Sequence, residues 1–341
     1  TNTDLNDPDP YPDVPVNCWT NGPGDVPVYY FDTTTPSVSQ FKELLVSEKP
    51  DVVYLNSMYS RQFMLKPLRL TRQLLPETKI VLAPRGMLSP GALLIKPFRK
   101  RLFLIFARSV GWFDEIHWHA SSTVEETEIR NVFGKRARIT VARNLTIPAH
   151  VEPYSKQKQA DELKLVYVAR ISPVKNLHQC LEILKDTPRS CNIRFDIYGD
   201  ADDPAYLEKC QEMVSALPSN VRVEMKGTVA NDELTDVLRN YHFMFLLTLN
   251  ENFGHAIVES LSAGCPVIIS DRTPWRRMNE AAAGWDLTLD DHPGIRSAVE
   301  HACRMEQEEY NTYLNGALSY AKSIHDDESA LTMNRKLFGA E

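Results

Sequence analysis

The stretch FMFLLTLNENFGHAIVESLSAGCPVIIS, residues 243–270, decides the fold of this chain. Its first segment, Phe243–Leu249, is uncharged and almost entirely apolar, which is typical of a strand buried on both faces of a parallel sheet. After a polar loop, apolar residues recur at helical spacing over His255–Ala263, and Gly264 is a residue type that commonly ends a helix. Cys265–Ser270 predicts a second strand. The stretch therefore predicts a strand, a loop, a helix and a strand in succession.

The loop between the predicted strand and helix is a candidate ligand site. Open α/β sheets bind ligands at the carboxyl ends of their strands, and the first amides of a helix have no partner within it. Here these amides belong to Phe253, Gly254 and His255, and Gly254 allows close approach. Glu251 in the loop and Glu259 on the helix add two carboxylates. Carboxylates accept hydrogen bonds from hydroxyls and amides donate to them, so the pattern favours a polyhydroxylated ligand.

Glu251 and Glu259, taken alone, are more typical of solvated surface acids. Their context is more specific, because this E-x7-E pair begins with Glu-Asn-Phe-Gly, includes Asn252, and is followed by Ala-Gly-Cys-Pro-Val. The combination resembles the signature of glycosyltransferase family 4, the retaining enzymes that use nucleotide sugars. The resemblance implies an α/β chain of two Rossmann-like domains, of the GT-B type, with a cleft between them.

Length and composition set the class of protein. At 341 residues the chain is long enough for two domains, and its 43% apolar and 24% charged content is ordinary for a soluble globular protein. Six cysteines without a C-x-x-C pair indicate neither a zinc site nor a disulfide framework. No signal peptide opens the sequence, and no apolar run reaches about 20 residues. We therefore expect a cytoplasmic protein, with a peripheral position at the inner face of the membrane as the alternative.

The N-terminal half predicts an alternating α/β pattern. Residues 1–26, rich in Pro, Asp, Asn and Gly, predict an irregular lead-in, and from Val26 onward strand and helix patterns alternate, which is typical of parallel strands with crossover helices. The resemblance assigns residues 1–152 to acceptor binding. Family members usually open with a strand and a Gly-rich loop, and none precedes Val28, so we expect a truncated acceptor side.

Arg85 and Gly86 follow a predicted strand, KIVLAP at 79–84, and so lie at the carboxyl end of the predicted sheet. Many family 4 members have His-Gly-Met where this chain has Arg-Gly-Met. A guanidinium cannot act as a base at neutral pH, although it can hold a phosphate or a carboxylate. The role of that histidine is therefore not carried over. Arg85 is a crevice candidate, with a structural ion pair as the alternative, and the resemblance places Gly86 in the donor site.

The segment KPFRKRLFLIFARSVGWF, residues 96–113, is basic at its start and apolar after it. One interpretation is a helix lying on a membrane surface through residues 96–108, and the other is a helix packed on the sheet with a charged edge. Residues 60–143 carry 16 Lys and Arg against 6 Asp and Glu. No nucleic-acid-binding motif accompanies this charge, so nucleic acid is not predicted as a partner. His117 and His119 alternate on a presumed strand, and no third ligand completes a metal site.

A second pair of candidate residues opens the C-terminal domain, predicted over 153–322. The strand LKLVYVAR, residues 163–170, ends in Arg170, and Lys175 lies just before the next helix. Two cations and the amides of a strand-to-helix turn can hold a diphosphate. Family 4 has this Arg-x4-Lys pair, and the resemblance implies that it binds the donor's phosphates. It also implies that a last helix, 323–341, packs back towards the N-terminal domain.

Two further strand ends are predicted to line the same crevice, and they are Tyr198-Gly199 and Gly227-Thr228. The resemblance implies transfer of a hexosyl group from a nucleotide diphosphate sugar to a saccharide or lipid-linked acceptor, with the anomeric configuration retained, in cell-surface polysaccharide or glycoconjugate synthesis. It implies no cofactor beyond the donor and no metal. The catalytic candidates are Arg170, Lys175 and Glu251, and the donor-binding candidates are Gly86, Tyr198, Gly199, Gly227, Thr228, Asn252, Phe253, Gly254, His255 and Glu259.

Three other functions fit parts of the pattern. A non-catalytic nucleotide-sugar-binding module would bind the donor and leave it intact, and a sugar-nucleotide epimerase would need no acceptor. A glycosidase could use Glu251 and Glu259 as acid and base, although a helix-borne pair beside a phosphate-binding turn is unlike that chemistry. The sequence leaves the base, the sugar, the acceptor, the linkage and the oligomeric state open.

Overall fold

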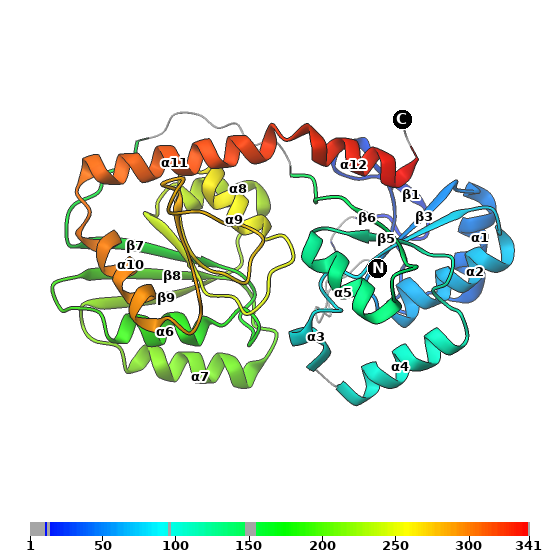
Figure 1. The fold of residues 1–341 in the computed structure, drawn as a ribbon, viewed down its shortest axis with the longest axis horizontal. Coiled ribbons are helices and arrows are strands. Elements are labelled where there is room, and N and C mark those ends of the chain that lie inside the picture. The colour runs from blue at the N-terminus through cyan, green and yellow to red at the C-terminus, as the bar shows by residue number, and fades with distance from the viewer. Residues whose placement is uncertain (1–10, 12–13, 95–96, 147–154, 340–341) are drawn as a thin grey trace. The chain divides into compact units, whose positions relative to one another are not determined.

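A computed structural model describes residues 11, 14–94, 97–146 and 155–339. The chain divides into two compact units (Figure 1). The N-terminal unit comprises the described residues up to Ala120 together with Glu126–Thr140, and the C-terminal unit comprises Ser121–Glu125 and the described residues from Val141 onward. Residues 147–154, which include the predicted domain boundary at 152, and Lys96, the first residue of the segment that is basic and then apolar, lie outside the described residues.

The N-terminal unit is built on a four-stranded sheet. Its strands lie in sequence order, β3 (Val52–Asn56), β4 (Lys79–Ala83), β5 (His117–Ala120) and β6 (Arg138–Val141), and the β3–β4 and β4–β5 pairs are parallel. Val81 and Leu82 of β4 are fully buried, as expected for an inner strand. The predicted parallel strands with crossover helices are thus confirmed for this sheet.

Helices connect these strands. Ser37 and Gln40 form a capping box at the start of α1, which satisfies two amides of the first turn. A π-helical segment over Arg61–Leu65 leads directly into the next helix. The helices are α1 (Val38–Glu48), α2 (Lys66–Leu74), α3 (Pro90–Leu94), α4 (Pro97–Ser109) and α5 (Thr123–Phe133).

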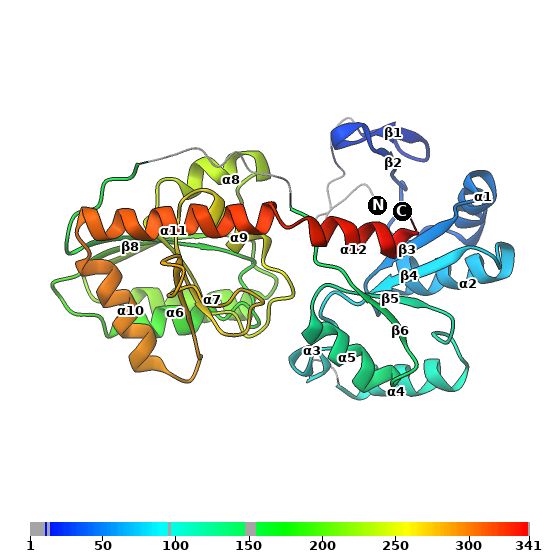
Figure 2. The same ribbon diagram turned by 45° about the horizontal axis from the view of Figure 1, so that its top comes forward.

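The prediction of an irregular lead-in is partly wrong. Trp19–Asn21 (β1) and Pro27–Tyr29 (β2) form an antiparallel pair that is separate from the parallel sheet (Figure 2). A short 3-10 helix, Pro23–Asp25, connects them. The strand predicted from Val26 therefore exists but pairs with its own upstream neighbour. A local pairing across a tight connection needs no crossover, and propensity alone does not reveal which partner a strand takes.

The C-terminal unit holds a six-stranded sheet in the order β12-β11-β10-β7-β8-β9, and every neighbouring pair is parallel. Counted within the unit, this is the order 3-2-1-4-5-6, which is that of the Rossmann fold. The strands are β7 (Glu162–Val168), β8 (Asn192–Tyr198), β9 (Val221–Gly227), β10 (Phe243–Leu246), β11 (Val267–Ser270) and β12 (Gly284–Leu287).

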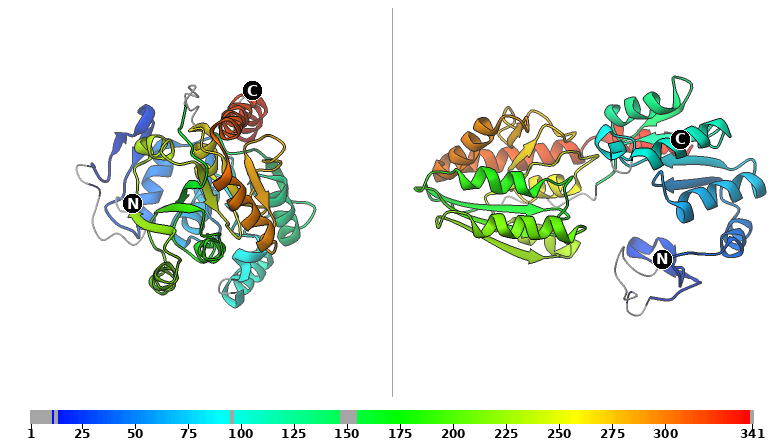
Figure 3. Two further views of the ribbon diagram at one scale, coloured as in Figure 1. Left: turned by 90° about the vertical axis from the view of Figure 1, so that its left-hand side faces the viewer. Right: turned by 90° about the horizontal axis from the view of Figure 1, so that it is seen from below.

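Helices cover both faces of this sheet (Figures 1 and 3). α6 and α7 lie on one face, and α8, α9 and α11 lie on the other. Turns occupy the segment between Ser270 and β12. The helices are α6 (Leu177–Lys185), α7 (Pro204–Ser215), α8 (Asn231–Leu238), α9 (His255–Ser262), α10 (His292–Arg304), α11 (Gln307–His325) and α12 (Glu328–Phe338).

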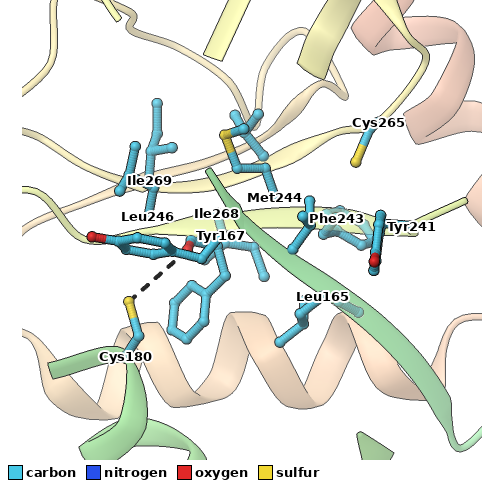
Figure 4. Close-up of a cluster of buried hydrophobic side chains, with 14 of the residues drawn as sticks. Leu165, Tyr167, Cys180, Tyr241, Phe243, Met244, Leu246, Cys265, Ile268 and Ile269 are labelled. Carbon is cyan, nitrogen blue, oxygen red and sulfur yellow. Dashed lines mark hydrogen bonds between the residues drawn. The ribbon is translucent and has the colours of Figure 1, made fainter. Parts of the chain in front are cut away.

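The core of the C-terminal unit forms around β10. All four of its residues are buried, because β7 and β11 flank the strand and helices cover both faces. Figure 4 shows Leu165, Met244 and Ile268 packed together from these three strands. Full burial of a side chain of this size contributes about 1.5–3 kcal/mol. The uncharged run that opened the sequence is therefore the centre of this core.

Helix α12 belongs to the C-terminal unit. Arg143 Nη2 donates to Asp327 Oδ2 at 2.7 Å, just before α12, and Asn334 Nδ2 donates to the Arg143 carbonyl at 2.8 Å. These contacts fix the helix to the segment that enters the unit. Packing of residues 323–341 towards the N-terminal domain, and the boundaries at 152 and 322, stay predictions.

A buried lysine anchors the chain as it enters the C-terminal sheet. Lys156 Nζ donates to the carbonyls of Leu238, the last residue of α8, and of Tyr241, at 3.2 and 2.8 Å. Burial lowers the pKa of Lys156 to about 8, from 10.5. Between these two values the unfolded chain holds a proton that the folded chain does not, so the free energy of unfolding increases with pH.

We expect this lysine to leave a measurable pH signature. Between pH 8 and about pH 10, wild type should gain about 2–3 kcal/mol of unfolding free energy relative to Lys156→Met, since each pKa unit corresponds to about 1.4 kcal/mol. Urea unfolding of both proteins at several pH values measures the difference. If the unfolding free energies of the two proteins change with pH in the same way, burial does not lower the pKa of Lys156.

Candidate functional site

The C-terminal sheet reverses its winding direction between β7 and β10. β8 and β9 extend it on one side, and β11 and β12 extend it on the other. Ligands of such sheets bind outside the carboxyl ends of the two strands at the reversal. Since β7 ends at Val168 and β10 ends at Leu246, the segments 169–176 and 247–254 meet at this position. Both segments are the ones that the sequence singled out.

The turn after β7 is held in place by buried polar side chains. Tyr167 Oη donates to the carbonyls of Arg170 and Lys175, at 3.3 and 3.4 Å, and so connects both ends of the turn. Asn176 is buried with φ of 59°, and its Nδ2 donates to the Leu247 carbonyl at 2.9 Å. The turn is therefore attached firmly to the segment that follows β10.

The loop after β10 is in turn hydrogen-bonded to the turn after β7 and to the segment after β11. Thr248 Oγ1 and the Leu249 amide both donate to the Val174 carbonyl, at 3.1 and 2.8 Å. The Glu251 amide donates to the Arg272 carbonyl at 3.0 Å. These bonds explain why β10 stops at Leu246, earlier than the predicted end at Leu249. The last residues of the apolar run leave the β-sheet and form hydrogen bonds with the turn after β7.

Lys175 and Glu251 meet across these two segments. Lys175 Nζ donates to Glu251 Oε2 at 2.5 Å, and their side chains are only 19% and 15% exposed. Opposite charges withdrawn from water interact more strongly than a surface pair. The structure thus brings together one predicted cation and one predicted acid.

A cavity of about 260 Å³ lies beside this ion pair. Gly254, with φ of 81°, immediately precedes α9, so the amino end of this helix faces the cavity. Helix amino ends carry a partial positive charge and unsatisfied amides. A cation, a carboxylate and a helix amino end suit a ligand with both phosphates and hydroxyls. The lining residues are Asn144, Val168, Ala169, Lys175, Leu246, Glu251, Asn252, Phe253, Gly254, His255, Ala256 and Ile257.

Arg170 takes a different direction from Lys175. Its side chain is 63% exposed, its Nη1 donates to Asp202 Oδ2 at 2.6 Å, and it does not line the cavity. An exposed ion pair contributes about 0–1 kcal/mol, so a bound ligand could redirect this arginine at low cost. Arg170 and Lys175 thus lie on the same turn, but their side chains bond to different acids.

The two predicted acids are separated in the same way. Glu259 lies within α9, half-buried and outside the cavity lining, and burial raises its pKa. Phe253 is buried between His255 and Trp275, with ring centroids 4.6 and 5.1 Å away. Phe253 therefore fixes the loop by packing, and only Glu251 of the acid pair reaches the cavity.

The residues at the other two predicted strand ends make hydrogen bonds within the C-terminal unit. Tyr198 Oη bonds to Tyr241 Oη at 3.1 Å, and Tyr241 Oη donates to buried Asp196 at 2.6 Å. The Gly199 amide donates to the Gly227 carbonyl at 2.8 Å. None of Tyr198, Gly199, Gly227 or the exposed Thr228 lines the 260 Å³ cavity, so their expected crevice position is not seen in that cavity.

Arg85 and Gly86 belong to the N-terminal unit. Arg85 Nε donates to Asn56 Oδ1 and its Nη2 donates to Tyr54 Oη, each at 3.0 Å, while Tyr54 Oη bonds to His119 Nδ1 at 2.6 Å. Arg85 has φ of 55° and Gly86 has φ of 74°, a left-handed turn at the end of β4. The guanidinium thus donates to Asn56 and Tyr54 at the carboxyl edge of the sheet.

Sequence reasoning missed several residues that build the site. Tyr167, Asn176 and Thr248 orient the two segments, and Asn144 and Ala256 line the cavity. Asn176, just before a helix and after the Lys175 turn, carried the only signal, as a residue type that tolerates the left-handed conformation. Among the described residues, no group of three or more His, Cys, Asp or Glu could hold a metal ion, and no helix is long and apolar enough to span a membrane.

Comparison with known proteins identifies the segment that carries this site. Residues 151–286 match the family described as glycosyl transferases group 1. The chain carries a group 1 glycosyl transferase domain. This domain contains Lys175, Glu251 and the loop before α9, so the resemblance to glycosyltransferase family 4, first seen in those residues, is confirmed.

Curated relatives match less than half of the chain. The gpi3 subunit of phosphatidylinositol N-acetylglucosaminyltransferase from Schizosaccharomyces pombe is 30% identical over 148 residues, which is 42% of this chain and 31% of that protein. The corresponding phosphatidylinositol N-acetylglucosaminyltransferase protein of Arabidopsis thaliana is 28% identical over 145 residues, 42% of this chain and 32% of that protein. The chain spans about a third of the length of these relatives.

Solved structures extend the likeness in fold to most of the chain. HepE from Anabaena, in complex with UDP and glucose, has a TM-score of 0.67 at 16% identity, covering 88% of this chain and 80% of that one. Sucrose-phosphate synthase from Thermosynechococcus elongatus has a TM-score of 0.69 at 16% identity, covering 89% and 78%. The group 1 domain and the preceding unit thus have the predicted fold, two Rossmann-like domains as in GT-B glycosyltransferases.

Proposed function

We propose that this protein transfers a hexosyl group from a nucleotide diphosphate sugar to a saccharide or lipid-linked acceptor, with retention of the anomeric configuration and without a metal. The observation that carries the proposal is the Lys175–Glu251 pair beside the amino end of α9, at the winding reversal of a group 1 domain. HepE, a neighbour in fold, was solved with UDP and glucose, which supports a donor of this class.

The charges suit departure of a nucleoside diphosphate. As the sugar–phosphate bond breaks, negative charge grows on the leaving phosphate, and a fixed cation and helix amides stabilise it without reorganisation. Lys175 and the first amides of α9 would act there, and Arg170 would turn from Asp202 to join them. Glu251 would accept hydrogen bonds from hydroxyls of the transferred sugar, and Glu259 would bind the ribose. The leaving phosphate itself would take the acceptor's proton.

The acceptor is proposed to be lipid-linked, in glycoconjugate synthesis at the inner face of a membrane. The curated relatives belong to a phosphatidylinositol N-acetylglucosaminyltransferase, which supports a lipid acceptor. Arg85, held by Tyr54 and Asn56, could bind a phosphate of such an acceptor. No cofactor beyond the donor enters this reaction.

Two experiments in sequence test this function. Thermal unfolding with UDP, GDP, ADP and their sugars identifies the donor, because a ligand that binds only the folded state raises the melting temperature. Proton NMR of the product made with that donor then reports the anomeric configuration. Inversion would refute the retaining mechanism. Binding of a donor that stays intact with every acceptor tested would favour a nucleotide-sugar-binding module instead.

Helix α4 supports contact with a membrane. One of its faces buries Leu104 and Ala107, while the opposite face leaves apolar side chains exposed. Phe98, Leu102, Ile105 and Phe106 are 51–73% exposed, and Arg99, Arg101 and Arg108 flank them. An apolar stripe bordered by arginines is the pattern of a helix lying in the interface of an anionic bilayer. Figures 1 and 2 show α4 along the outer edge of its own unit.

We expect Leu102→Ser combined with Phe106→Ser to weaken binding to phosphatidylserine-containing vesicles by about tenfold or more, because each exchange removes apolar area from the bilayer contact. Co-sedimentation with vesicles measures the change. Val46→Ser, on an equally exposed position of α1, is the matched control and should have no effect. Equal loss in both proteins, or no vesicle binding by wild type, would assign α4 to another role.

A further inference from the structure

A second cavity, of about 390 Å³, lies within the N-terminal unit at the amino ends of its strands. Lys79, His117 and Arg138 are the first residues of β4, β5 and β6, and all three line it. Arg72 from the last turn of α2 and Glu115 complete its charged lining. The cavity lies at the opposite end of these strands from Arg85, and so it is separate from the carboxyl edge, where open sheets bind their substrates.

The charge of this cavity is strongly unbalanced. Arg72, Lys79 and Arg138 are cationic at neutral pH, and Glu115 is the one carboxylate among the lining residues. Concave surfaces lined by one sign of charge concentrate the field and attract ions of the opposite sign. A guanidinium also matches the oxygens of a phosphate in a planar fork. The lining therefore has the composition of an anion site.

The pKa of His117 responds to the electrostatic potential inside the cavity. Its Nε2 bonds to Thr140 Oγ1 at 2.7 Å. Burial lowers the pKa of His117, and the positive charges of Lys79, Arg138 and His119 lower it further. A bound anion would oppose these charges and favour the protonated imidazole. Occupation of the cavity is thus linked to proton uptake at His117, with Glu115 and Arg72 as the remaining charged neighbours on the cavity wall.

We propose that this cavity binds a small phosphate-bearing anion, held by Arg72, Lys79 and Arg138. Three cations and the carboxylate of Glu115 leave a net charge of +2, which matches a dianion, and the volume falls in the usual range of small-molecule sites, about 300–1,000 Å³. A free phosphate compound and the headgroup of an anionic lipid share this chemistry. The site is independent of the nucleotide-sugar site, which lies in the other unit, and its occupancy can regulate or position the protein without entering the transfer reaction.

Calorimetric titration of the full chain with inorganic phosphate and with glycerol 3-phosphate tests the proposal. We expect saturable binding by wild type, weakened at least about tenfold in Lys79→Gln/Arg138→Gln, since each charge-assisted contact is strong. Arg136→Gln is the matched control, because Arg136 is exposed two residues away and does not line the cavity. Binding of wild type, but not of Lys79→Gln/Arg138→Gln, to vesicles that contain phosphatidic acid would indicate a lipid headgroup, and binding of the soluble phosphates alone would indicate a free phosphate compound.

Sulfate gives a second, independent readout, because it keeps its charge of −2 between pH 5 and 8. Its affinity should increase several-fold from pH 7.5 to 5.5 as His117 gains a proton, and His117→Asn should abolish this dependence. NMR of the His117 imidazole should show its pKa rising with sulfate. Absence of saturable binding by wild type, or undiminished binding by Lys79→Gln/Arg138→Gln, would overturn the proposal. Donor affinity should stay unchanged in these variants, which separates this test from that of the transferase.

Discussion

Replacing Lys175 with Met should lower kcat/KM for the nucleotide-sugar donor by about 10² or more. Lys175 is the cation that lines the cavity beside α9, and it is only 19% exposed. A hydrogen-bond-donating group that is already fixed towards the developing negative charge contributes on the order of 10²–10³ in rate, because it needs no reorganisation in the transition state. Steady-state kinetics with the donor identified by thermal unfolding measures the effect.

Arg170 provides the comparison for this prediction. It lies at the same turn, but it is 63% exposed and paired with Asp202, so Arg170→Met should cost less than Lys175→Met. Arg277→Met, at an exposed arginine that is paired with Glu280 and does not line the cavity, should leave turnover unchanged. A larger loss for Arg170 than for Lys175 would mean that the phosphates bind on the Asp202 side of the turn.

Replacing Lys175 should also lower the free energy of unfolding. Removing the lysine leaves Glu251 half-buried without its partner, and breaking a buried pair is destabilising. Lys175→Met combined with Glu251→Gln should therefore recover part of the lost unfolding free energy while activity stays low. Recovery of both quantities in the double variant would show that the pair is structural rather than catalytic.

Gly199→Ala should destabilise the C-terminal unit by about 3 kcal/mol or more. Gly199 has φ of 142°, and a Cβ there would lie 2.0 Å from the carbonyl oxygen of Ala169, the residue before Arg170. The clash involves backbone on both sides, so no side chain can yield, and overpacking adds to the strain of a positive φ. The shift would also displace the turn that carries Lys175, so activity should decrease with stability.

Gly227 is the matched control for Gly199. It also ends a strand of the same sheet and has φ of 72°, but nothing lies within 4 Å of an added Cβ. Gly227→Ala should therefore cost only the backbone strain, about 1–2 kcal/mol. Urea unfolding of the two variants gives the comparison. Equal costs would show that β7 and β8 can separate at their ends without penalty.

The sequence predicted the strand, loop, helix and strand of residues 243–270 closely, because both strands are uncharged runs and the helix carries apolar residues at helical spacing. It did not predict the β1–β2 pair, since the partner of a short strand depends on contacts that propensity does not encode. The orientation of the site residues was also open. Arg170 and Lys175 are five positions apart at one turn, yet Asp202 holds the first and Glu251 holds the second.

What the sequence determined by itself is the location of the candidate site: strand ends, a glycine before a helix, and an E-x7-E motif that resembles a family signature. What only the tertiary structure decided is which of these residues meet. The sheet order 3-2-1-4-5-6 places β7 beside β10, so turns some seventy residues apart share one cavity. The physical reason is that a sequence fixes local backbone preferences, whereas the pairing of strands, the burial of Asn176 and the direction of a flexible arginine depend on all neighbours at once.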